Sequence, residues 1–357
     1  MKNVSPLRLG FTFAGSFVGA GYVSGQEIWQ FFGRFGFGAL PGLALAMLLM
    51  GAIGVMVWEL ARGLDMTEMD RLVVEREIPV LRVALSVMQE VMLFGFLVIM
   101  CAGAVALCVQ QWGLPFLPCA VVLTAAVGVV SLAGVPGLVN FFSAMVPVLC
   151  VVTVAAAVAS PFVTGNSIVI APAEKAFGGW PVSAVVFFAY NTFGVLGILA
   201  PVGPMAKDRR SIRQGIVIGC VVLAAIALSV LLAMTVVTEA VQTEMPMLAV
   251  MAACFPALAP AYAVLLLVVM FGAALGCQVA LMNFLEEKFP KVRAHRVLWT
   301  FLIMAASLLG SFVGFSDLIG VLYPIFGYCG VGFLILLAVH WLHKRKELSF
   351  KELGVRN

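Results

Sequence analysis

Charged side chains are scarce in this chain. Asp, Glu, Lys and Arg together make up 11% of its 357 residues, whereas hydrophobic residues make up 63%. The longest polar interval, from Arg62 to Arg82, is too short to bury a core of its own. Apolar runs of about 20 residues recur instead, and each is long enough to cross the ~30 Å hydrocarbon core of a bilayer. The composition therefore excludes a soluble domain and predicts an all-α integral membrane protein.

Pairs of metal-binding or catalytic residues are also missing from the sequence. The eight cysteines lie in or beside apolar segments without a Cys-x-x-Cys pair, which indicates neither a metal site nor a disulfide framework. No His cluster, metal-ligand set or nucleophile motif falls at membrane depth, so we expect no enzyme activity, no metal and no cofactor. Lys and Arg at cytoplasmic helix ends account for the formal net charge of +4, and we expect no nucleic-acid partner.

Ten transmembrane helices are predicted from the apolar runs and from the charged or Pro/Gly-rich breaks between them. We expect a single membrane domain that ends in a short cytoplasmic tail, residues 342–357. Residues 1–10 have no long basic region, and no small-residue cleavage site follows the apolar run, so we expect the first span to be retained. The predicted spans lie near residues 8–33, 38–61, 82–110, 115–133, 138–160, 181–206, 212–238, 257–285, 295–313 and 317–341.

Lys and Arg are distributed asymmetrically over the predicted loops. With a cytoplasmic N-terminus, only Arg34 and Lys175 of the 21 basic residues fall outside. One missing or additional span would reverse every later loop and destroy this asymmetry, so the positive-inside rule favours ten spans with both termini in the cytoplasm. The basic residues expected inside are Lys2, Arg8, Arg62, Arg71, Arg76, Arg82, Lys207, Arg209, Arg210, Arg213, Lys288, Lys291, Arg293, Arg296, Lys344, Arg345, Lys346, Lys351 and Arg356.

Spans one to five and spans six to ten start at a nearly constant offset of about 175 to 180 residues. The chain thus divides into repeat one, about residues 8–160, and repeat two, about residues 181–341. Because each repeat holds an odd number of spans, the second enters the membrane from the opposite side. The sequence therefore predicts a 5+5 inverted repeat, an arrangement found in many secondary transporters.

Glycine and polar residues interrupt the first span. The segment from Val18 to Glu27 contains three glycines and a carboxylate. Lipid cannot satisfy backbone loosened in this way, so such backbone is stable at membrane depth only where it lines a cavity or a ligand. The equivalent part of span six, Tyr190 to Pro204, also holds polar residues, glycines and prolines. We therefore expect helices 1 and 6 to be discontinuous, although small residues also serve close helix packing.

The segment from Gly15 to Glu27, with Gly19-Ala20-Gly21 inside it, resembles the glycine-rich first-helix signature of the amino acid-polyamine-organocation (APC) superfamily. Members of this superfamily have the LeuT fold. The continuation Gly25-Gln26-Glu27-Ile28 is similar to the YkvI-like group of bacterial membrane proteins. The resemblance covers all ten spans in topology and implies a multi-pass transporter fold in the bacterial plasma (inner) membrane.

The paired interruptions and the resemblance together predict a secondary active transporter that works by alternating access. Strongly anionic substrates usually require Arg or Lys, which neither interruption contains, so we expect a small neutral or zwitterionic solute, an amino acid or related amine. The expected partners are this solute, the lipid bilayer and a coupling proton. A non-transporting, ligand-sensing membrane receptor subunit with the same fold is the alternative.

The exposed backbone ends of two broken helices suit a zwitterion. A carboxylate would bind N–H groups around Ala20, Gly21 and Ser24, and an ammonium would bind carbonyls near Gly19 and after Asn191. Aromatic residues of spans three and six would form an apolar wall, although aromatic residues at helical spacing also serve packing. The predicted substrate-binding residues are Gly19, Ala20, Gly21, Ser24, Phe94, Tyr190, Asn191, Thr192, Phe193 and Gly194.

Carboxylates at or near membrane depth are candidates for coupling, because an unpaired charge is costly there. Glu59 lies three residues before Arg62, which favours a paired or snorkelling role, and Asp317 lies at a helix start, where it can act as a cap. We predict that Glu27 is the principal coupling acid and that Glu90 is a second candidate. The alternative for Glu27 is structural: it would accept backbone hydrogen bonds at the break or pair with Arg34.

Sodium sites of the related transporters combine carbonyls of the first helix with hydroxyls on span eight. The interval from Glu244 to Trp299 contains no Ser or Thr, and its central part, Phe271 to Gln278, offers one thiol and one amide. Some proton-coupled relatives place a lysine on span five, but Val139 to Ser160 contains none. We therefore expect coupling to a proton, or exchange, rather than coupling to sodium.

The outer loop from Thr238 to Pro260 is long and mostly apolar after Met245. Its apolar face, Met247 to Phe255, is expected to pack into the outer entrance as a lid. An ordinary folded surface loop is the alternative.

Overall fold

Helices make up the regular structure of this protein, in a computed structural model that describes residues 4–64, 79–133, 138–170, 172–175 and 178–352. Repeat one comprises α1 (Pro6–Phe17), α2 (Ala20–Ser24), α3 (Gln26–Phe31), η1 (Gly33–Gly38), α4 (Ala39–Leu64), α6 (Pro79–Trp112), α7 (Phe116–Ala133) and α8 (Leu138–Thr164). Repeat two comprises α9 (Gly179–Leu199), η2 (Ala200–Met205), α10 (Arg209–Val236), η3 (Thr238–Gln242), α11 (Pro246–Cys254), α12 (Ala259–Lys288), α13 (Pro290–Ala294), α14 (Arg296–Ser311) and α15 (Phe315–Glu352).

Eight helices of the described chain are long and apolar enough to cross a membrane. The other two predicted spans correspond to α14, a shorter apolar helix, and to the interrupted chain of α1, α2 and α3. The element order is therefore that of a multi-pass membrane protein and is consistent with ten spans.

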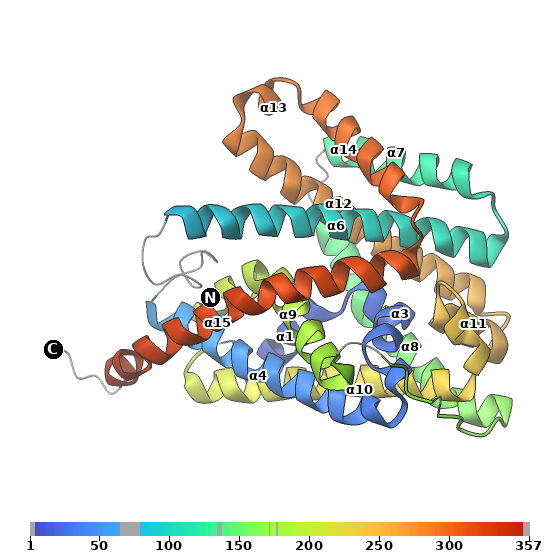
Figure 1. Cartoon of the computed structure of the whole chain (residues 1–357), viewed down its shortest axis with the longest axis horizontal. Helices are drawn as coiled ribbons and strands as arrows, with labels where there is room; N and C mark the ends of the chain where they lie inside the picture. The colour runs from blue at the N-terminus through green and yellow to red at the C-terminus, as the bar shows by residue number, and fades with distance from the viewer. Residues whose placement is uncertain (1–3, 65–78, 134–137, 171, 176–177, 353–357) are drawn as a thin grey trace.

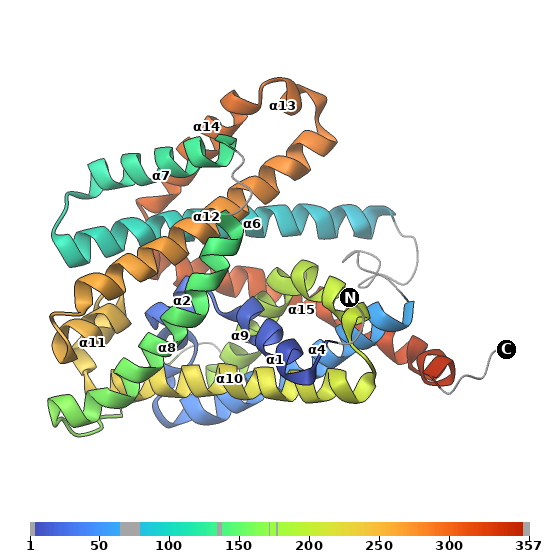
Figure 2. The same cartoon turned by 180° about the vertical axis from the view of Figure 1, so that it is seen from behind.

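The long helices form two groups joined by two crossing helices (Figure 1). Helices α6, α7, α12 and α14 belong to one group, and α1, α4, α9 and α10 to the other. Helix α8 contacts both α10 and α12, and α15 contacts both α9 and α6. Figure 2 shows α8 crossing from the α10 side of the molecule to the α12 side.

The helix contacts repeat when the two halves of the chain are exchanged. Helix α1 packs on α10, and the equivalent pair, α9 and α4, also packs together. The contact of α8 with α12 likewise corresponds to that of α15 with α6. This exchange of contacts is the pattern expected of a 5+5 inverted repeat, so the helix packing agrees with the predicted fold.

The first span is interrupted, as predicted. Helix α1 ends at Phe17, Val18 and Gly19 are extended, and α2 begins at Ala20. Gly25 separates α2 from α3 with a φ of 87°, a left-handed conformation that favours glycine. A Cβ at Gly25 would also contact the flexible end of the Met234 side chain, but it is the backbone angle that requires glycine there.

The sixth span differs from its prediction, because α9 runs without interruption through Tyr190 and Gly194 to Leu199. The change in helix type comes later, where the chain continues as the 3₁₀ helix η2. This helix contains both prolines of the segment, Pro201 and Pro204. Proline lacks an N–H donor, whereas glycine lowers helix propensity by only about 1 kcal/mol and keeps its hydrogen bond. A Cβ at Gly194 would lie 3.2 Å from the Phe96 ring, so this glycine permits close packing instead of a break.

Predicted inner segments meet on one face of the molecule. Val4 pairs with Ala206, and Arg62 donates a 2.8 Å hydrogen bond to the Lys207 carbonyl. Two predicted outer segments also meet, because the Glu174 N–H donates to the Arg34 carbonyl at 2.9 Å. Helix α11 lies at the opposite end from the chain termini (Figure 1).

Candidate solute and coupling site

Glu27 lies in the first turn of α3, directly after the interruption of the first span. Its side chain is buried, with 4% of its surface exposed. The Tyr190 hydroxyl donates a short hydrogen bond to Glu27 Oε1, and Asn191 Nδ2 donates to the same oxygen at 3.1 Å. Both donors are neutral and come from one turn of α9, so α9 holds the carboxylate without a charged partner.

Gly21 provides the space for this carboxylate. A Cβ placed on Gly21 would lie 2.9 Å from Glu27 Oε2 and 3.7 Å from Ile319. The glycine at this position therefore lets the carboxylate of α3 fold back against the backbone of α2. The N-terminus of α2 has no side-chain cap among the described residues, and a short helix leaves its first N–H groups without internal partners.

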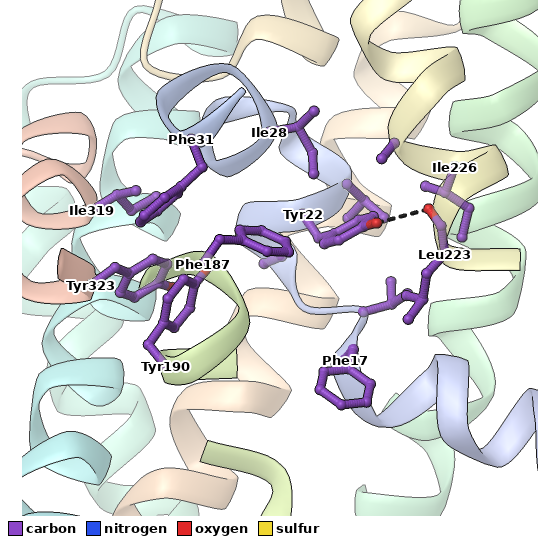
Figure 3. Packing of buried hydrophobic residues seen from close by; sticks show 14 of the residues in the cluster. Phe17, Tyr22, Ile28, Phe31, Phe187, Tyr190, Leu223, Ile226, Ile319 and Tyr323 are labelled. Carbon is purple, nitrogen blue, oxygen red and sulfur yellow. Dashed lines mark hydrogen bonds between the residues drawn. The ribbon is translucent and has the colours of Figure 1, made fainter. Parts of the chain in front are cut away.

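Aromatic rings from α3, α9 and α15 gather around Tyr190 (Figure 3). The Tyr190 ring stacks on Tyr323 of α15, with centroids 4.4 Å apart, and lies 5.3 Å from Phe31. Phe187 contacts Tyr190 edge-on at 5.8 Å. Phe96 of α6 extends this aromatic wall by an edge contact with Tyr323 at 5.7 Å.

Two tyrosine hydroxyls anchor the interrupted backbone. Tyr22 donates to the Leu223 carbonyl of α10 at 2.8 Å, as Figure 3 shows. Tyr262 of α12 donates to the Val23 carbonyl at 3.1 Å, and its oxygen lies 2.9 Å from Thr153 Oγ1 of α8. Tyr262 was not among the predicted site residues, because span eight contains no Ser or Thr, although tyrosine also supplies a hydroxyl.

Helix α11 covers one side of the interruption. This helix buries Met247, Leu248, Val250 and Met251 and contacts α2, α8, α10 and α12. A Cβ at Gly25 would lie 3.2 Å from Met247 Cγ, so α11 packs directly on the break. Beside it, Gln26 Nε2 donates to Ser316 Oγ of α15. Helix α11 thus lies where the predicted lid is expected to pack. That it opens and closes remains a prediction.

Comparisons with known proteins agree with this arrangement. No family model matches the chain. It is 22% identical over 352 residues to the uncharacterized membrane protein YkvI of Bacillus subtilis strain 168, covering 96% of this chain and 98% of YkvI. It is 26% identical over 339 residues to the uncharacterized protein YyaD of the same organism, covering 91% of this chain and 94% of YyaD.

Solved structures decide the fold. Mhp1, a nucleobase-cation-symport-1 family transporter solved in a closed conformation with bromovinylhydantoin bound, matches with a TM-score of 0.60 at 13% identity, over 97% of this chain and 80% of Mhp1. The chain has the LeuT fold. An Eremococcus coleocola manganese transporter matches with a TM-score of 0.51 at 12% identity, over 99% of this chain and 88% of that chain.

Within this LeuT fold, several predicted site residues lie at or next to the interruption. Glu27, Gly21, Tyr190 and Asn191 come together, as described above. Ala20 is buried in α2, and the Ser24 hydroxyl donates to the Gly21 carbonyl at 3.1 Å. Gly19 is exposed, with no atom within 4 Å of an added Cβ, so the backbone there has open space beside it.

Other predicted residues lie elsewhere. Phe193 stacks on Phe333 of α15 at 5.4 Å, and Gly194 packs on Phe96. Thr192 is buried, and its hydroxyl has no hydrogen-bond partner among the described residues. Phe94 lines a separate cavity, which it shares with Glu90, whereas Phe96, the other aromatic residue of span three expected at the apolar wall, contacts Tyr323 there.

The remaining membrane acids have other partners. Glu59 is buried, and its Oε1 lies 3.8 Å from Arg209 Nε and 3.5 Å from Arg213 Nη2. Trp341 Nε1 donates to Glu59 Oε2 at 3.0 Å, so the acid joins α4, α10 and α15. Asp317 lies in the first turn of α15. Arg34 is 4.0 Å from Glu174, so the alternative pairing of Arg34 with Glu27 is wrong.

Proposed function

We propose that this protein is a secondary active transporter that carries a small neutral or zwitterionic solute, an amino acid or related amine, by alternating access. The observation that carries the proposal is Glu27, a buried carboxylate at the interruption of the first span whose described partners are the neutral donors Tyr190 and Asn191. The LeuT fold supports it, because the two solved matches are named as transporters.

Glu27 is suited to exchange a proton. A buried carboxylate without a cationic partner is costly in its ionised form, and protonation removes that cost. Its Oε1 is occupied by Tyr190 and Asn191, which leaves Oε2, beside Gly21, for a proton or a cationic group. Opening and closing of the site would change the exposure of this oxygen to water and thereby drive proton uptake and release.

The same oxygen suits the ammonium group of a solute. The carbonyls after Asn191, at which an ammonium was predicted, belong to the continuous α9 and accept its helix hydrogen bonds. We place the ammonium at Glu27 Oε2 and a solute carboxylate at the uncapped N–H groups of Ala20 and Gly21. A proton and an ammonium then compete for one carboxylate, which favours exchange of protons for solute.

Tyr262 supports coupling to protons over coupling to sodium. A sodium ion at the first-helix break would need free backbone carbonyls as hard oxygen ligands. The Val23 carbonyl already accepts a hydrogen bond from Tyr262, whose hydroxyl also contacts Thr153. A neutral hydroxyl network therefore occupies this part of the interruption.

The test begins with thermal unfolding of the purified protein in the presence of each proteinogenic amino acid and a set of aliphatic amines, because a bound ligand raises the unfolding temperature. The radiolabelled compound with the largest shift is then used for uptake into proteoliposomes. We expect accumulation when the lumen is acidic and none from a sodium gradient alone. Glu27→Gln should abolish accumulation, whereas Glu239→Gln, at an exposed glutamate of η3, should not change it.

Two results would contradict the proposal. Accumulation by Glu27→Gln at the wild-type level would show that Glu27 is not the coupling acid. Saturable binding by the wild-type protein without uptake in any gradient would instead indicate the ligand-sensing receptor subunit.

A further inference from the structure

A second cavity lies between α6 and α12, and neither Glu27 nor its partners line it. Its volume is about 850 Å³, within the range of pockets that bury small organic ligands. The cavity contains two groups of opposite charge, Glu90 from α6 and Lys288 from the last turn of α12. Most of the other lining residues are apolar, and three of them are aromatic: Phe94, Phe284 and Phe289.

The cavity lies where α6 begins and α12 ends. A Cβ at Gly103, further along α6, would lie 3.2 Å from Met270 in the middle of α12, whereas the cavity joins Glu90 to Lys288 at the end of α12. The two helices are therefore antiparallel. Their candidate spans start at Val83 and end at Lys288, which places the cavity at the same end of both spans. A water-soluble ligand can thus enter from that end.

The two charges share the cavity without neutralising each other. Glu90 Oε2 is buried and has no hydrogen-bond partner among the described residues. Lys288 is exposed, and no ion pair joins it to Glu90 in that part of the chain. A buried carboxylate oxygen without a partner is costly, and a ligand with a positively charged N–H donor removes this cost. An anionic group on the same ligand would pair with Lys288.

The two charges together favour a zwitterion over a ligand with a single charge. An amine without a carboxylate would bring a second cation toward Lys288, and a carboxylic acid without an ammonium would bring a second anion toward Glu90. The apolar and aromatic lining favours a large apolar side chain on this zwitterion, because aromatic rings pack against one another in stacked or edge contacts.

We propose that this cavity is a second binding site, for a zwitterion of the aromatic amino acid class. The ammonium donates to Glu90 Oε2, the carboxylate pairs with Lys288, and the aromatic side chain packs between Phe94 and Phe284. This site is separate from the solute site at Glu27, and its existence does not depend on the proposed transport.

Equilibrium dialysis of the purified full-length protein with radiolabelled L-phenylalanine tests this proposal. The Glu27→Gln protein is used, because it lacks the acid of the first site, and we expect one saturable site in it. Phenylpropanoate lacks the ammonium and phenethylamine lacks the carboxylate, so each should compete about tenfold more weakly than phenylalanine, the effect of one charge-assisted hydrogen bond. Glycine, which has no side chain to bury, should also compete at least about tenfold more weakly.

Substitutions at the two charges should act on different competitors. Glu90→Gln and Lys288→Gln should each weaken phenylalanine binding about tenfold. Glu90→Gln should also remove the preference over phenylpropanoate, and Lys288→Gln should remove the preference over phenethylamine. Glu287→Gln and Lys291→Gln are matched controls, because both residues are exposed near the same helix end and neither lines the cavity.

Lys288 is exposed at a helix end, so Lys288→Gln in the otherwise wild-type protein tests the site even if Glu27→Gln or Glu90→Gln does not fold. Absence of saturable phenylalanine binding would overturn the proposal. So would equal competition by the three aromatic compounds, unchanged binding by Lys288→Gln, or an equal loss in the control variants. A failure of transport would leave these outcomes unchanged, because they measure binding alone.

Discussion

Glu27 and Glu59 are equally buried, with 4% of each residue exposed, yet their surroundings differ. Two arginines of α10 lie within 3.8 Å of Glu59, and Trp341 donates to it. Glu27 receives hydrogen bonds only from the neutral groups of Tyr190 and Asn191 among the described residues. The charge of the partners, rather than burial, distinguishes Glu59, which holds helices together, from Glu27, which we propose exchanges a proton.

This difference follows from the electrostatics of buried acids. Cationic partners keep a carboxylate ionised and make it part of the structure, whereas neutral donors lower the cost of its charge without removing it. We therefore expect mutations at Glu59 to act on stability and mutations at Glu27 to act on transport.

Glu59→Gln should have the largest effect on stability. It leaves Arg209 and Arg213 without their carboxylate, and we expect the free energy of unfolding to fall by about 2 kcal/mol, below the range for fully buried pairs because the Arg213 side chain is 64% exposed. Thermal unfolding in detergent measures this loss. The folded Glu59→Gln protein should still accumulate solute in a pH gradient. An unchanged unfolding temperature would show that the ion pairs of Glu59 do not stabilise the protein.

Trp341→Phe should have a smaller effect at the same cluster. The substitution keeps an aromatic ring but removes the N–H donor to Glu59 Oε2, so we expect a loss of about 1 kcal/mol. Combination with Glu59→Leu, which removes both carboxylate oxygens, in a double-mutant cycle checks the coupling between the two residues. Fully additive losses would mean that the 3.0 Å hydrogen bond contributes nothing to stability.

Glu27→Gln should have the opposite effects to Glu59→Gln, with transport lost and stability kept. Its amide oxygen still accepts hydrogen bonds from Tyr190 and Asn191, while the buried charge is removed, so we expect the free energy of unfolding to stay within about 0.5 kcal/mol of the wild-type value or to rise. Pairing thermal unfolding with the uptake assay separates the two acids. A destabilisation as large as that of Glu59→Gln would make Glu27 a structural acid as well.

Asp208 is an acid outside the membrane-spanning helices, and its substitution should have the smallest effect on stability. The backbone N–H of Ser211 donates to Asp208 Oδ1 at 2.7 Å, and this hydrogen bond holds the pKa of the carboxyl below its ordinary value of 3.8. The N-cap contribution of this charge is therefore present at neutral pH and is lost as the pH falls below 3.8 through the lower folded-state pKa. Asp208→Ala should lower the unfolding temperature slightly at pH 7, and the difference from wild type should shrink on acidification. A difference that does not change with pH would contradict the role of the charge.

Local properties of the chain predicted much of the architecture. Hydrophobic length identified the membrane helices, and the glycines between Val18 and Glu27 located the interruption of the first span. In span six the same reasoning placed the interruption too early: the α-helix passes the glycines and ends at Leu199, because glycine permits a break but does not require one. At Gly194 the absent side chain gives space to Phe96, a neighbour that hydropathy cannot reveal.

The partners of the buried polar groups could not be predicted from the sequence. Residues Tyr190 and Asn191 were predicted as substrate ligands, and the structure places both on Glu27. The anchoring of Val23 by Tyr262 and the pairing of Glu59 with α10 likewise join residues far apart in the chain. These contacts depend on which helix faces meet.

The sequence by itself determined that this is a membrane protein with an interrupted first span and an acid beside that interruption. These features follow from hydrophobicity and backbone freedom, which each short segment carries in its own residues. Only the tertiary structure decided that α9 stays continuous, that Glu27 has neutral partners and that Glu90 lies in a separate cavity with Lys288. The cost of a buried charge depends on its neighbours, and the packing of distant helices chooses those neighbours.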